Sequence, residues 1–385
     1  MQLITPLEKF YQFEEEKSNQ TFLRQAHNSQ WMHFSWKRVG NEVRKMTAYI
    51  QSLNLPKQSK IAILSENCAH WIMADLAIMM SGHVSVPLYP SISGDLVKYC
   101  LEHSESKLLF VGKAPKWNEQ KNAVPKKIQK ISFPFWQHDG CEDWNDIIKD
   151  VQPISKNYIP KLEDSVTIIY TSGTTGLPKG VVHNFKAFAF AATALLEEIE
   201  KLGLLTDNER FLSFLPLSHI AERMLVEMGG LYSGATISFA ESLDLFAANL
   251  KDTKPTIFLA VPRIWTKFQM GILGKMPQNK LNLLLKIPII NNIIKKKIKE
   301  GLGLDQAKYL LTGAAPLPVA TMLWFEKLGF IIYEAYAMTE NCAYSHLNRK
   351  DKRKPGYAGV AMPHCDVKIS DEGEILVKSE ATMFG

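Results

Sequence analysis

The stretch from residue 166 to residue 180 constrains this chain more than any other, both in its fold and in its ligand. It reads Val-Thr-Ile-Ile-Tyr-Thr-Ser-Gly-Thr-Thr-Gly-Leu-Pro-Lys-Gly. Its first five residues, mostly β-branched and apolar, predict a buried strand. The loop that follows combines hydroxyl side chains with glycines, which let backbone amides approach a ligand closely. These loop residues are Thr171, Ser172, Gly173, Thr174, Thr175 and Gly176.

Lys179 adds one ammonium group at the end of this loop, and residues 185–202, rich in Ala, Leu and Phe, predict a helix after it. A strand, a loop of glycines and hydroxyls, a lysine and a helix form a typical site for oxyanions, most often nucleotide phosphates. The spacing is not that of the Walker A loop, because Leu177 and Pro178 separate Gly176 from Lys179. A surface loop of Ser, Thr and Gly is the alternative, but eleven consecutive residues of this kind behind a buried strand favour phosphate binding.

Apolar runs of strand length alternate with helical patterns along most of the chain, which predicts an α/β fold with two doubly wound subdomains. Strands are expected at residues 61–64, 84–88, 108–111, 211–215, 235–239, 256–261, 309–311 and 330–333. Helices are expected at residues 36–53, 70–81, 94–103, 222–232, 243–250, 263–272 and 319–328. Polar residues 115–160 are interpreted as an irregular excursion, and alternation at 367–378 predicts an antiparallel hairpin. We expect subdomains at roughly 1–205 and 206–345, and the start of a β-rich piece at 346–385.

Composition narrows the class of protein further. With 385 residues, 46% of them hydrophobic, the chain can bury a large core. The net charge of +6 is mild and most basic residues are interleaved with acids, which argues against nucleic-acid binding. Five cysteines without C-x-x-C spacing, and no signal-peptide pattern at the N-terminus, indicate a cytoplasmic protein.

Residues 274–300 stand out because lysines alternate there with Leu and Ile. Two interpretations are open. The first is a basic amphipathic surface that binds anionic lipid headgroups at the periphery of a membrane, or the phosphates of a charged cofactor. The second is a pair of helices with one solvated lysine face, which such charge runs usually are.

Four further segments follow predicted strands, where open α/β sheets bind their ligands. They are Leu-Pro-Leu-Ser-His-Ile-Ala-Glu-Arg at 215–223, Val-Pro-Arg at 261–263, Thr-Gly-Ala-Ala-Pro-Leu at 312–317 and Tyr-Glu-Ala-Tyr-Ala-Met-Thr-Glu at 333–340. Together with the loop at 171–180, they resemble the ordered motifs of the adenylate-forming, or AMP-binding, superfamily. Its members include acyl-CoA synthetases, luciferases and the adenylation domains of peptide synthetases. The closest resemblance is to the long-chain fatty acyl-CoA synthetases, and it extends from residue 60 to residue 385.

This resemblance implies an acid–thiol ligase that uses ATP, Mg²⁺ and CoA. A long-chain fatty acid would attack the α-phosphate of ATP to form an acyl-adenylate and diphosphate, and the acyl group would then pass to CoA. Two alternatives remain open, namely an adenylate-forming enzyme for another substrate, such as an aryl acid, and an inert nucleotide-binding remnant. The residues contain no signal for acyl chain length or oligomeric state.

The resemblance also implies a role for individual residues. The loop from Thr171 to Gly176, with Lys179, would hold the β- and γ-phosphates. The Thr171 hydroxyl and the Glu340 carboxylate would hold Mg²⁺, a hard cation that prefers oxygen ligands. The remaining nucleotide-binding residues would be Gly313, Ala314, Ala315 and Pro316 beside the adenine, Glu334, Ala335 and Tyr336, with Tyr336 stacked on the base, and Thr339 near the α-phosphate.

Two residues of the motif at 215–223 carry open alternatives. His219 matches a family histidine near the acyl carboxylate and the α-phosphate, and a hydrogen-bonded core histidine is the alternative. Arg223 lies four residues further on and is expected either to line the acyl entrance or to lie on a helix surface.

The chain departs from the family pattern at two places. Ala337 occupies a position where relatives commonly have glycine; if that position requires a positive φ, alanine would cost about 1 kcal/mol and displace Tyr336. The sequence also ends at Gly385, before the Thr-Gly-Asp motif and the small C-terminal domain with its catalytic lysine. Full ligase activity is therefore not expected of residues 1–385 alone.

Overall fold

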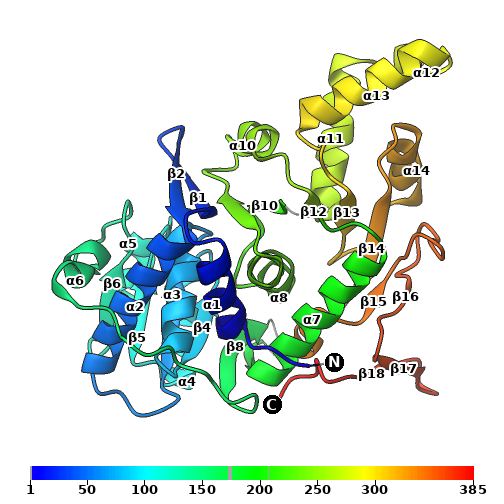
Figure 1. The fold of residues 1–385 in the computed structure, drawn as a ribbon. Helices are drawn as coiled ribbons and strands as arrows, with labels where there is room; N and C mark the ends of the chain where they lie inside the picture. Colours follow the sequence, from blue (N-terminus) through cyan, green and yellow to red (C-terminus); the bar gives the residue numbers. More distant parts are fainter. Residues whose placement is uncertain (1, 172–175, 207) are drawn as a thin grey trace.

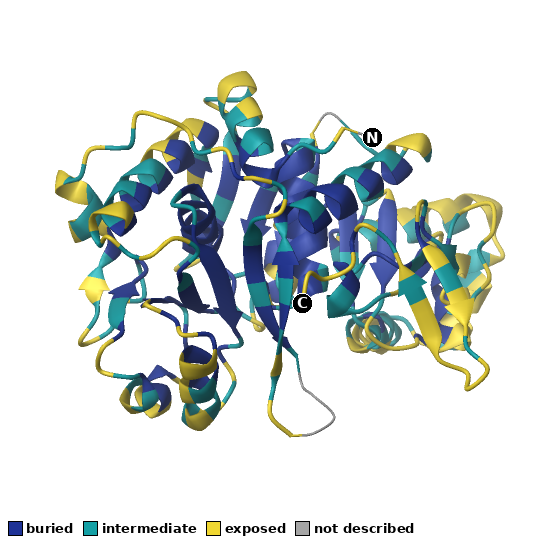
Figure 2. Ribbon diagram, turned by 90° about the horizontal axis from the view of Figure 1, so that it is seen from below, coloured by how far each residue is buried: buried dark blue, intermediate teal, exposed yellow. Residues whose placement is uncertain are grey.

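The computed structural model describes residues 2–171, 176–206 and 208–385. Within these residues the chain has the α/β architecture that the sequence predicts, with helices packed around sheets of seven, five, four and two strands (Figure 1). The strands of the larger sheets are mostly buried and the outer faces of the helices are exposed (Figure 2). The last residues of the chain lie along strand β9, where the Val182 amide donates to the Gly385 carbonyl and the Phe384 amide donates to the Val182 carbonyl.

The seven-stranded sheet has the order β7-β6-β5-β3-β4-β8-β9, and its strands are parallel except for the last pair. Its strands are β3 (Lys60–Leu64), β4 (Val84–Leu88), β5 (Leu108–Val111), β6 (Gln129–Ser132), β7 (Glu142–Asp143), β8 (Ser165–Thr171) and β9 (Lys179–Asn184). Side chains of β3 alternate between the two faces. Ile61 and Ile63 share a core cluster with residues of α2 (Trp36–Ser52) and α3 (Ala69–Met80), and Ala62 shares another with α4 (Gly94–His103). The sheet is therefore covered by helices on both faces.

Two predictions about this sheet were wrong. Residues 115–160 are not an irregular excursion, since they contain α5 (Trp117–Gln120), η1 (Lys121–Ala123), β6, β7 and α6 (Trp144–Asp150), and the two strands extend the sheet at one edge. β6 was missed because it is short and its first two residues are only half-buried. The second error concerns β9: its first residues were predicted as the end of the loop and no strand was expected before residue 185, although β9 pairs antiparallel with β8 before helix α7 (Phe185–Lys201) begins.

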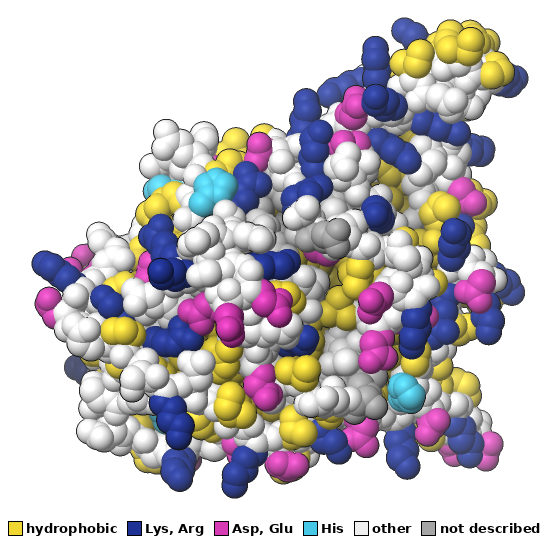
Figure 3. All heavy atoms as spheres, in the orientation of Figure 1, with side chains coloured by type: hydrophobic (Ala, Val, Ile, Leu, Met, Phe, Trp, Pro, Cys, Tyr) yellow, Lys and Arg dark blue, Asp and Glu magenta, His cyan; other side chains and the backbone are white. Residues whose placement is uncertain are grey.

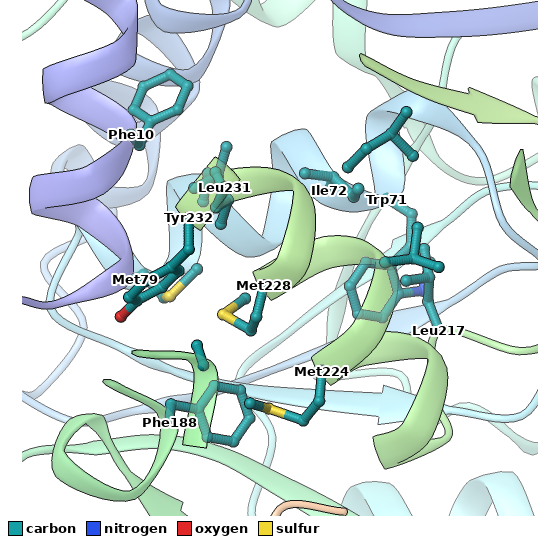
Figure 4. Packing of buried hydrophobic residues seen from close by; sticks show 14 of the residues in the cluster. Phe10, Trp71, Ile72, Met79, Phe188, Leu217, Met224, Met228, Leu231 and Tyr232 are labelled. Atoms are coloured by element: carbon teal, nitrogen blue, oxygen red, sulfur yellow. The ribbon is translucent and has the colours of Figure 1, made fainter. Parts of the chain in front are cut away.

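The four-stranded sheet joins the start of the chain to its middle. Its order is β10-β11-β1-β2, formed by β1 (Thr21–His27), β2 (Gln30–Ser35), β10 (Arg210–Ser213) and β11 (Thr236–Phe239). Between β10 and β11 the chain forms a continuous helical stretch of α8 (Ile220–Glu222), the π-helix η2 (Arg223–Met228) and α9 (Gly229–Ser233). Met224 and Met228 of this stretch pack in one core with Trp71 and Met79 of α3, Phe188 of α7 and Phe10 of α1 (Pro6–Glu16) (Figure 4).

The five-stranded sheet has the order β12-β13-β14-β15-β16, with the first three strands parallel and the last two antiparallel. Its strands are β12 (Ile257–Ala260), β13 (Tyr309–Thr312), β14 (Ile332–Tyr336), β15 (His346–Leu347) and β16 (Val360–Ala361). The helices of this region are α10 (Phe246–Thr253), α11 (Pro262–Lys275), α12 (Gln278–Leu285), α13 (Pro288–Leu302) and α14 (Val319–Lys327). The hairpin of β17 (Asp366–Ile369) and β18 (Ile375–Lys378) confirms the prediction for 367–378.

The predicted subdomain boundaries remain a prediction. Among the helices of the described residues, none combines the length and the apolar run needed to cross a bilayer.

Candidate active site

A cavity of about 540 Å³ lies where the end of β8, the ends of β13 and β14, and the helical stretch after β10 come together. This volume falls within the range of small-molecule binding sites. One part of the lining is polar, contributed by Thr171, His219, Glu222, Thr339, Glu340 and His346. The rest is largely apolar, contributed by residues such as Leu195, Met224, Leu225, Tyr309, Leu311, Tyr344, Leu347 and Met362. The cavity can therefore accept a ligand with a charged end and a long apolar part.

The β8–β9 hairpin carries the predicted phosphate loop. Thr171 ends β8, lines the cavity and pairs with Lys179 at the start of β9. Ser172, Gly173, Thr174 and Thr175 lie outside the described residues. Gly176 has φ +100°, and a Cβ there would meet no atom within 4 Å, so glycine is needed at this position for its backbone conformation and not for space. The Lys179 side chain is exposed and lies outside the set of residues that line the cavity.

His219 lines the cavity and is the N-cap of the helical stretch, where its Nδ1 accepts a hydrogen bond of 3.2 Å from the Ala221 amide. Burial lowers the pKa of His219, which favours the neutral ring. With Nδ1 used as an acceptor, the ring proton is assigned to Nε2, which makes that nitrogen a hydrogen-bond donor. His219 is thus part of the cavity wall, and its role there remains a prediction.

The loop before His219 is held by a residue that sequence reasoning missed. Buried Asn67 donates to the Leu215 carbonyl and accepts a 2.9 Å hydrogen bond from the Leu217 amide. These contacts satisfy the polar groups of a loop that would otherwise leave them unpaired in the interior. A lone asparagine after β3 carries no periodic signal, so only its distant partners reveal its role.

Glu222 is a second buried polar residue beside this loop. Its Oε1 accepts hydrogen bonds from the Ser213 hydroxyl at 2.9 Å and the Phe214 amide at 3.0 Å. Burial nevertheless raises the pKa of Glu222 to about 8, because loss of solvent penalises the charged form more than these donors favour it. The side chain therefore lines the cavity as a mostly neutral carboxylic acid at pH 7.

Of the residues predicted beside the base, Gly313, Ala314 and Ala335 line the cavity, whereas Ala315 and Pro316 are exposed and lie outside its lining. Gly313 passes close to β14, since a Cβ there would lie 3.2 Å from the Ala335 carbonyl oxygen. Glycine at 313 thus allows the loop to cross the strand.

Glu334 and Tyr336 also lie outside the cavity lining. The buried Glu334 carboxylate accepts from the Leu317 amide at 3.4 Å and the Gly356 amide at 2.9 Å, which ties the loop after β13 to β14. Tyr336 is 36% exposed, with its ring centroid 5.8 Å from that of His346. Ala337 lines the cavity and its φ is not positive, so the strain considered for alanine at this position does not arise.

Thr339 and Glu340 begin a short 3₁₀ turn, η3 (Thr339–Asn341), and both line the same cavity as Thr171. Among residues 2–171, 176–206 and 208–385, the Glu340 carboxylate has no hydrogen-bond or ion-pair partner. A free carboxylate and a threonine hydroxyl on one cavity fit the ligand preference of Mg²⁺, which is commonly bound through one or two carboxylates together with substrate phosphates. The donor set is therefore chemically suitable for this ion.

Both expectations for Arg223 were wrong. The residue is not part of the cavity lining, and it does not lie on a helix surface because its side chain is fully buried. Its guanidinium contacts Asp75 at 2.5 Å, Glu227 at 3.2 Å, the Thr167 hydroxyl at 2.7 Å and the Ser85 hydroxyl at 3.1 Å. Arg223 thus joins the π-helix beside the cavity to α3, β4 and β8.

The sequence of this chain matches one protein family and several curated proteins. A model described as AMP-binding enzyme matches residues 11–385. The long-chain-fatty-acid–CoA ligase ACSBG2 of Xenopus laevis is 27% identical over 94% of this chain and 55% of its own length. The long-chain-fatty-acid–CoA ligase FadD15 of Mycobacterium bovis is 26% identical over 92% of this chain and 64% of its own length. The chain thus spans just over half to nearly two thirds of these curated relatives.

Solved structures share the fold at lower identity. The inhibitor-bound N-terminal domain of FACL13 from Mycobacterium tuberculosis has a TM-score of 0.78 at 21% identity, covering 99% of this chain and 90% of that one. The anthranilate CoA ligase AuaEII in complex with anthranoyl-AMP has a TM-score of 0.80 at 20% identity, covering 99% of this chain and 71% of that one. At such identities the likeness concerns the fold alone.

Proposed function

The chain belongs to the family of AMP-binding enzymes, and on this premise we propose that it binds ATP and a long-chain fatty acid as part of an acid–thiol ligase. The reaction converts fatty acid and ATP to acyl-adenylate and diphosphate, and then acyl-adenylate and CoA to acyl-CoA and AMP. The family match and the names of relatives that are 26–27% identical support this class of reaction.

One observation carries the proposal, namely the cavity in which Thr171, His219, Thr339 and Glu340 share one lining with apolar side chains. A fatty acid has the matching form, with a carboxylate at one end and an alkyl chain behind it. Burial of each CH₂ group of that chain contributes about 0.8 kcal/mol, so the apolar part of the lining can supply much of the binding energy. A purely phosphate-binding site would not need these apolar side chains.

The polar residues have distinct proposed roles. The loop from Thr171 to Gly176, with Lys179, holds the β- and γ-phosphates. Nε2–H of His219 donates to an oxygen of the acyl carboxylate or of the α-phosphate, and Thr339 lies beside that phosphate. These contacts neutralise and orient the two anions that must meet when the carboxylate attacks phosphorus and diphosphate leaves.

Mg²⁺ would be held by the Thr171 hydroxyl and the Glu340 carboxylate, and it would supply charge neutralisation on the phosphate oxygens. The loop from Gly313 to Pro316, with Ala335, is proposed to flank the adenine. Glu334 keeps this loop in place through the Leu317 amide, and the exposed ring of Tyr336 is available for stacking on the base.

The acyl part of the proposal is tested by narrowing the apolar lining. Leu195→Trp should weaken binding of palmitate about tenfold while the affinity for ATP is unchanged, because the added ring occupies space for the alkyl chain only. Isothermal titration calorimetry measures both affinities, and Leu243→Trp at an 82% exposed position is the matched control. Equal palmitate affinity in all three proteins would contradict the assignment of the apolar lining to the acyl chain.

The nucleotide part is tested with Lys179→Ala. Loss of the ammonium should weaken ATP binding about tenfold and leave the thermal midpoint unchanged, because the side chain is exposed. Lys107→Ala, at another exposed lysine, is the control. Unchanged ATP affinity in Lys179→Ala would remove Lys179 from the site.

Acid-dependent exchange of diphosphate into ATP identifies the substrate class. Exchange with palmitate and not with benzoate or anthranilate is expected. Exchange with the aryl acids alone would favour an aryl-acid ligase. Because the catalytic lysine belongs to the small C-terminal domain, the assay is run with and without a supplied C-terminal domain, and ATP binding without exchange in both cases would favour a nucleotide-binding protein that does not activate acids.

A further inference from the structure

The net positive charge of this protein is concentrated in one segment. Residues 262–302, which form helices α11, α12 and α13, contain nine Lys and Arg residues and one acid, Glu300. The whole chain has 45 basic and 39 acidic residues, so the remainder has 36 basic and 38 acidic ones. The segment, which we call the arm, therefore carries a charge of +8 on a body whose charge is −2. Figure 1 shows the arm projecting from the rest of the molecule, with α12 at its end.

Large apolar side chains are exposed at the tip of the arm. Leu283 is 63% exposed, Ile287 42%, Ile289 76% and Ile293 48%. They belong to the end of α12, the connection to α13 and the first two turns of α13. Figure 3 shows hydrophobic side chains gathered at this tip, with Lys and Arg side chains beside and below them. Contiguous exposed apolar side chains of this kind mark interaction surfaces.

Helical spacing places the apolar and basic side chains on common faces. On α12, Leu283 lies three residues from both Lys280 and Lys286, and on α13, Ile293 lies four residues after Ile289 and four before Lys297. These lysines are exposed.

The opposite side of the arm packs against the protein. Leu281 is buried, and Ile294, Ile298 and Leu302 pack on the core that includes Phe325 and Trp265. The orientation of the outer face is therefore set by the packing of the inner one. The apolar tip and its lysines are presented outward together.

From these observations we propose that the arm docks on the surface of a bilayer that contains anionic lipids, with Leu283, Ile287, Ile289 and Ile293 entering the headgroup boundary. The surrounding lysines would contact the anionic headgroups, an arrangement in which apolar burial and electrostatic attraction act together. A bilayer with anionic lipids complements both the positive charge and the apolar side chains of the arm. The phosphates of a soluble cofactor or a nucleic acid would engage the lysines but would leave four large apolar side chains in water.

The arm is connected to the cavity wall through the start of α11. Val261 lines the cavity, and α11 begins at the next residue. The base of the arm is thus joined directly to the cavity wall, while its apolar tip lies beyond the other end of α11. Lipid binding itself does not depend on the proposed ligase activity, so the two can fail separately.

The proposal is tested by co-sedimentation of the 385-residue protein with vesicles of phosphatidylcholine alone or with about 30% phosphatidylserine. We expect binding to the anionic vesicles that falls steeply as salt rises and little binding to neutral ones. The triple variant Lys280→Glu, Lys286→Glu and Lys297→Glu should lower the partition coefficient at least about tenfold. The double variant Leu283→Ser and Ile289→Ser should lower it about tenfold while keeping the net charge.

Matched controls distinguish an effect of the arm from a general effect of net charge or of exposed apolar side chains. Lys107→Glu, Lys126→Glu and Lys127→Glu change the net charge by the same amount at exposed sites outside the arm, and Leu243→Ser with Leu376→Ser removes exposed apolar side chains elsewhere. Both controls should bind vesicles as the wild type does. All the changed side chains are exposed, and thermal midpoints check that the variants fold.

Three outcomes would overturn the proposal. Equal wild-type binding to neutral and anionic vesicles would show that anionic lipids do not attract the lysines. Equal loss of vesicle binding in the arm and control variants would show that the arm is not the binding surface. Retained vesicle binding by the triple arm variant, together with weakened CoA binding in calorimetry, would show that the lysines serve a soluble polyphosphate.

Discussion

The imidazole of His183 on β9 lies 2.8 Å, through Nε2, from the carbonyl oxygen of Thr339. Its Nδ1 lies 3.3 Å from Sγ of Cys342, and the side chain is completely buried. Burial lowers the pKa of His183 to about 4, so the ring is neutral at pH 7. Nε2 then donates to the carbonyl and Nδ1 accepts from the thiol. One residue thus connects the hairpin of the phosphate loop to the turn that carries Thr339 and Glu340.

We predict that His183 acts by positioning this turn. In His183→Phe the ring is kept and both hydrogen bonds are lost, so kcat for acid-dependent ATP–diphosphate exchange should fall about tenfold or more while KM for ATP changes less. His183→Gln, whose amide can still donate to the Thr339 carbonyl, should recover much of the rate. Cys342→Ala removes only the weaker partner and is the control. An equal loss of kcat and stability in the Phe and Gln variants would indicate a purely structural role.

Glu340 should determine the response of nucleotide binding to Mg²⁺. Glu340→Gln keeps the shape of the side chain and removes its charge, so ATP binding in the presence of Mg²⁺ should weaken about tenfold. Binding of AMP without metal should be unchanged. Calorimetry with both nucleotides, with Mg²⁺ or with EDTA, measures the difference. If AMP and Mg²⁺–ATP lose affinity equally, Glu340 supports the cavity wall and does not hold the ion.

Arg223 should be essential for stability. Arg223→Met leaves the buried Asp75 and Glu227 without their cation, which should lower the free energy of unfolding by about 3–5 kcal/mol. Urea denaturation measures this loss. Arg38→Met is the control, because Arg38 pairs with Glu42 on the surface and should contribute only about 0–1 kcal/mol. A small loss in Arg223→Met, similar to that of the control, would contradict the network seen around the guanidinium.

Glu222 should make stability depend on pH between the ordinary carboxyl pKa and about 8. Its pKa is raised to about 8 in the folded protein, so between the ordinary carboxyl pKa and 8 the folded state binds more protons than the unfolded state. The contribution to stability is complete below the ordinary value, falls as pH rises from that value, and is lost once pH has passed through 8. Relative to the wild type, Glu222→Gln should therefore gain stability from pH 6 to pH 8, by at most about 1.4 kcal/mol per pH unit. Parallel urea midpoints for the two proteins over this range would show that Glu222 is ionised in the fold.

The local sequence pattern was sufficient to predict most of the helices and strands. The expected strand at 84–88 and helix at 94–103 coincide with β4 and α4, because a short, mostly apolar run and an amphipathic repeat each reflect burial of that segment alone. Pattern failed for β9, which begins with exposed Lys179 and half-buried Gly180 and whose first residues show no alternation of apolar and polar side chains. Its strand character comes from its antiparallel partner β8 and not from its own sequence.

The sequence by itself determined the α/β class, the order of the motifs and the residue types available for phosphate, carboxylate and metal binding. These features depend on each residue and its close neighbours. Only the tertiary structure decided which of those side chains meet. Asn67 and Leu217 are 150 residues apart and His183 and Thr339 are 156 apart, and Arg223 and Asp75 are separated by 148. Such contacts depend on how sheets and helices pack, and no local periodicity encodes them. For the same reason, the sequence alone could not show that Arg223 is buried or that the Glu334 carboxylate accepts hydrogen bonds from backbone amides.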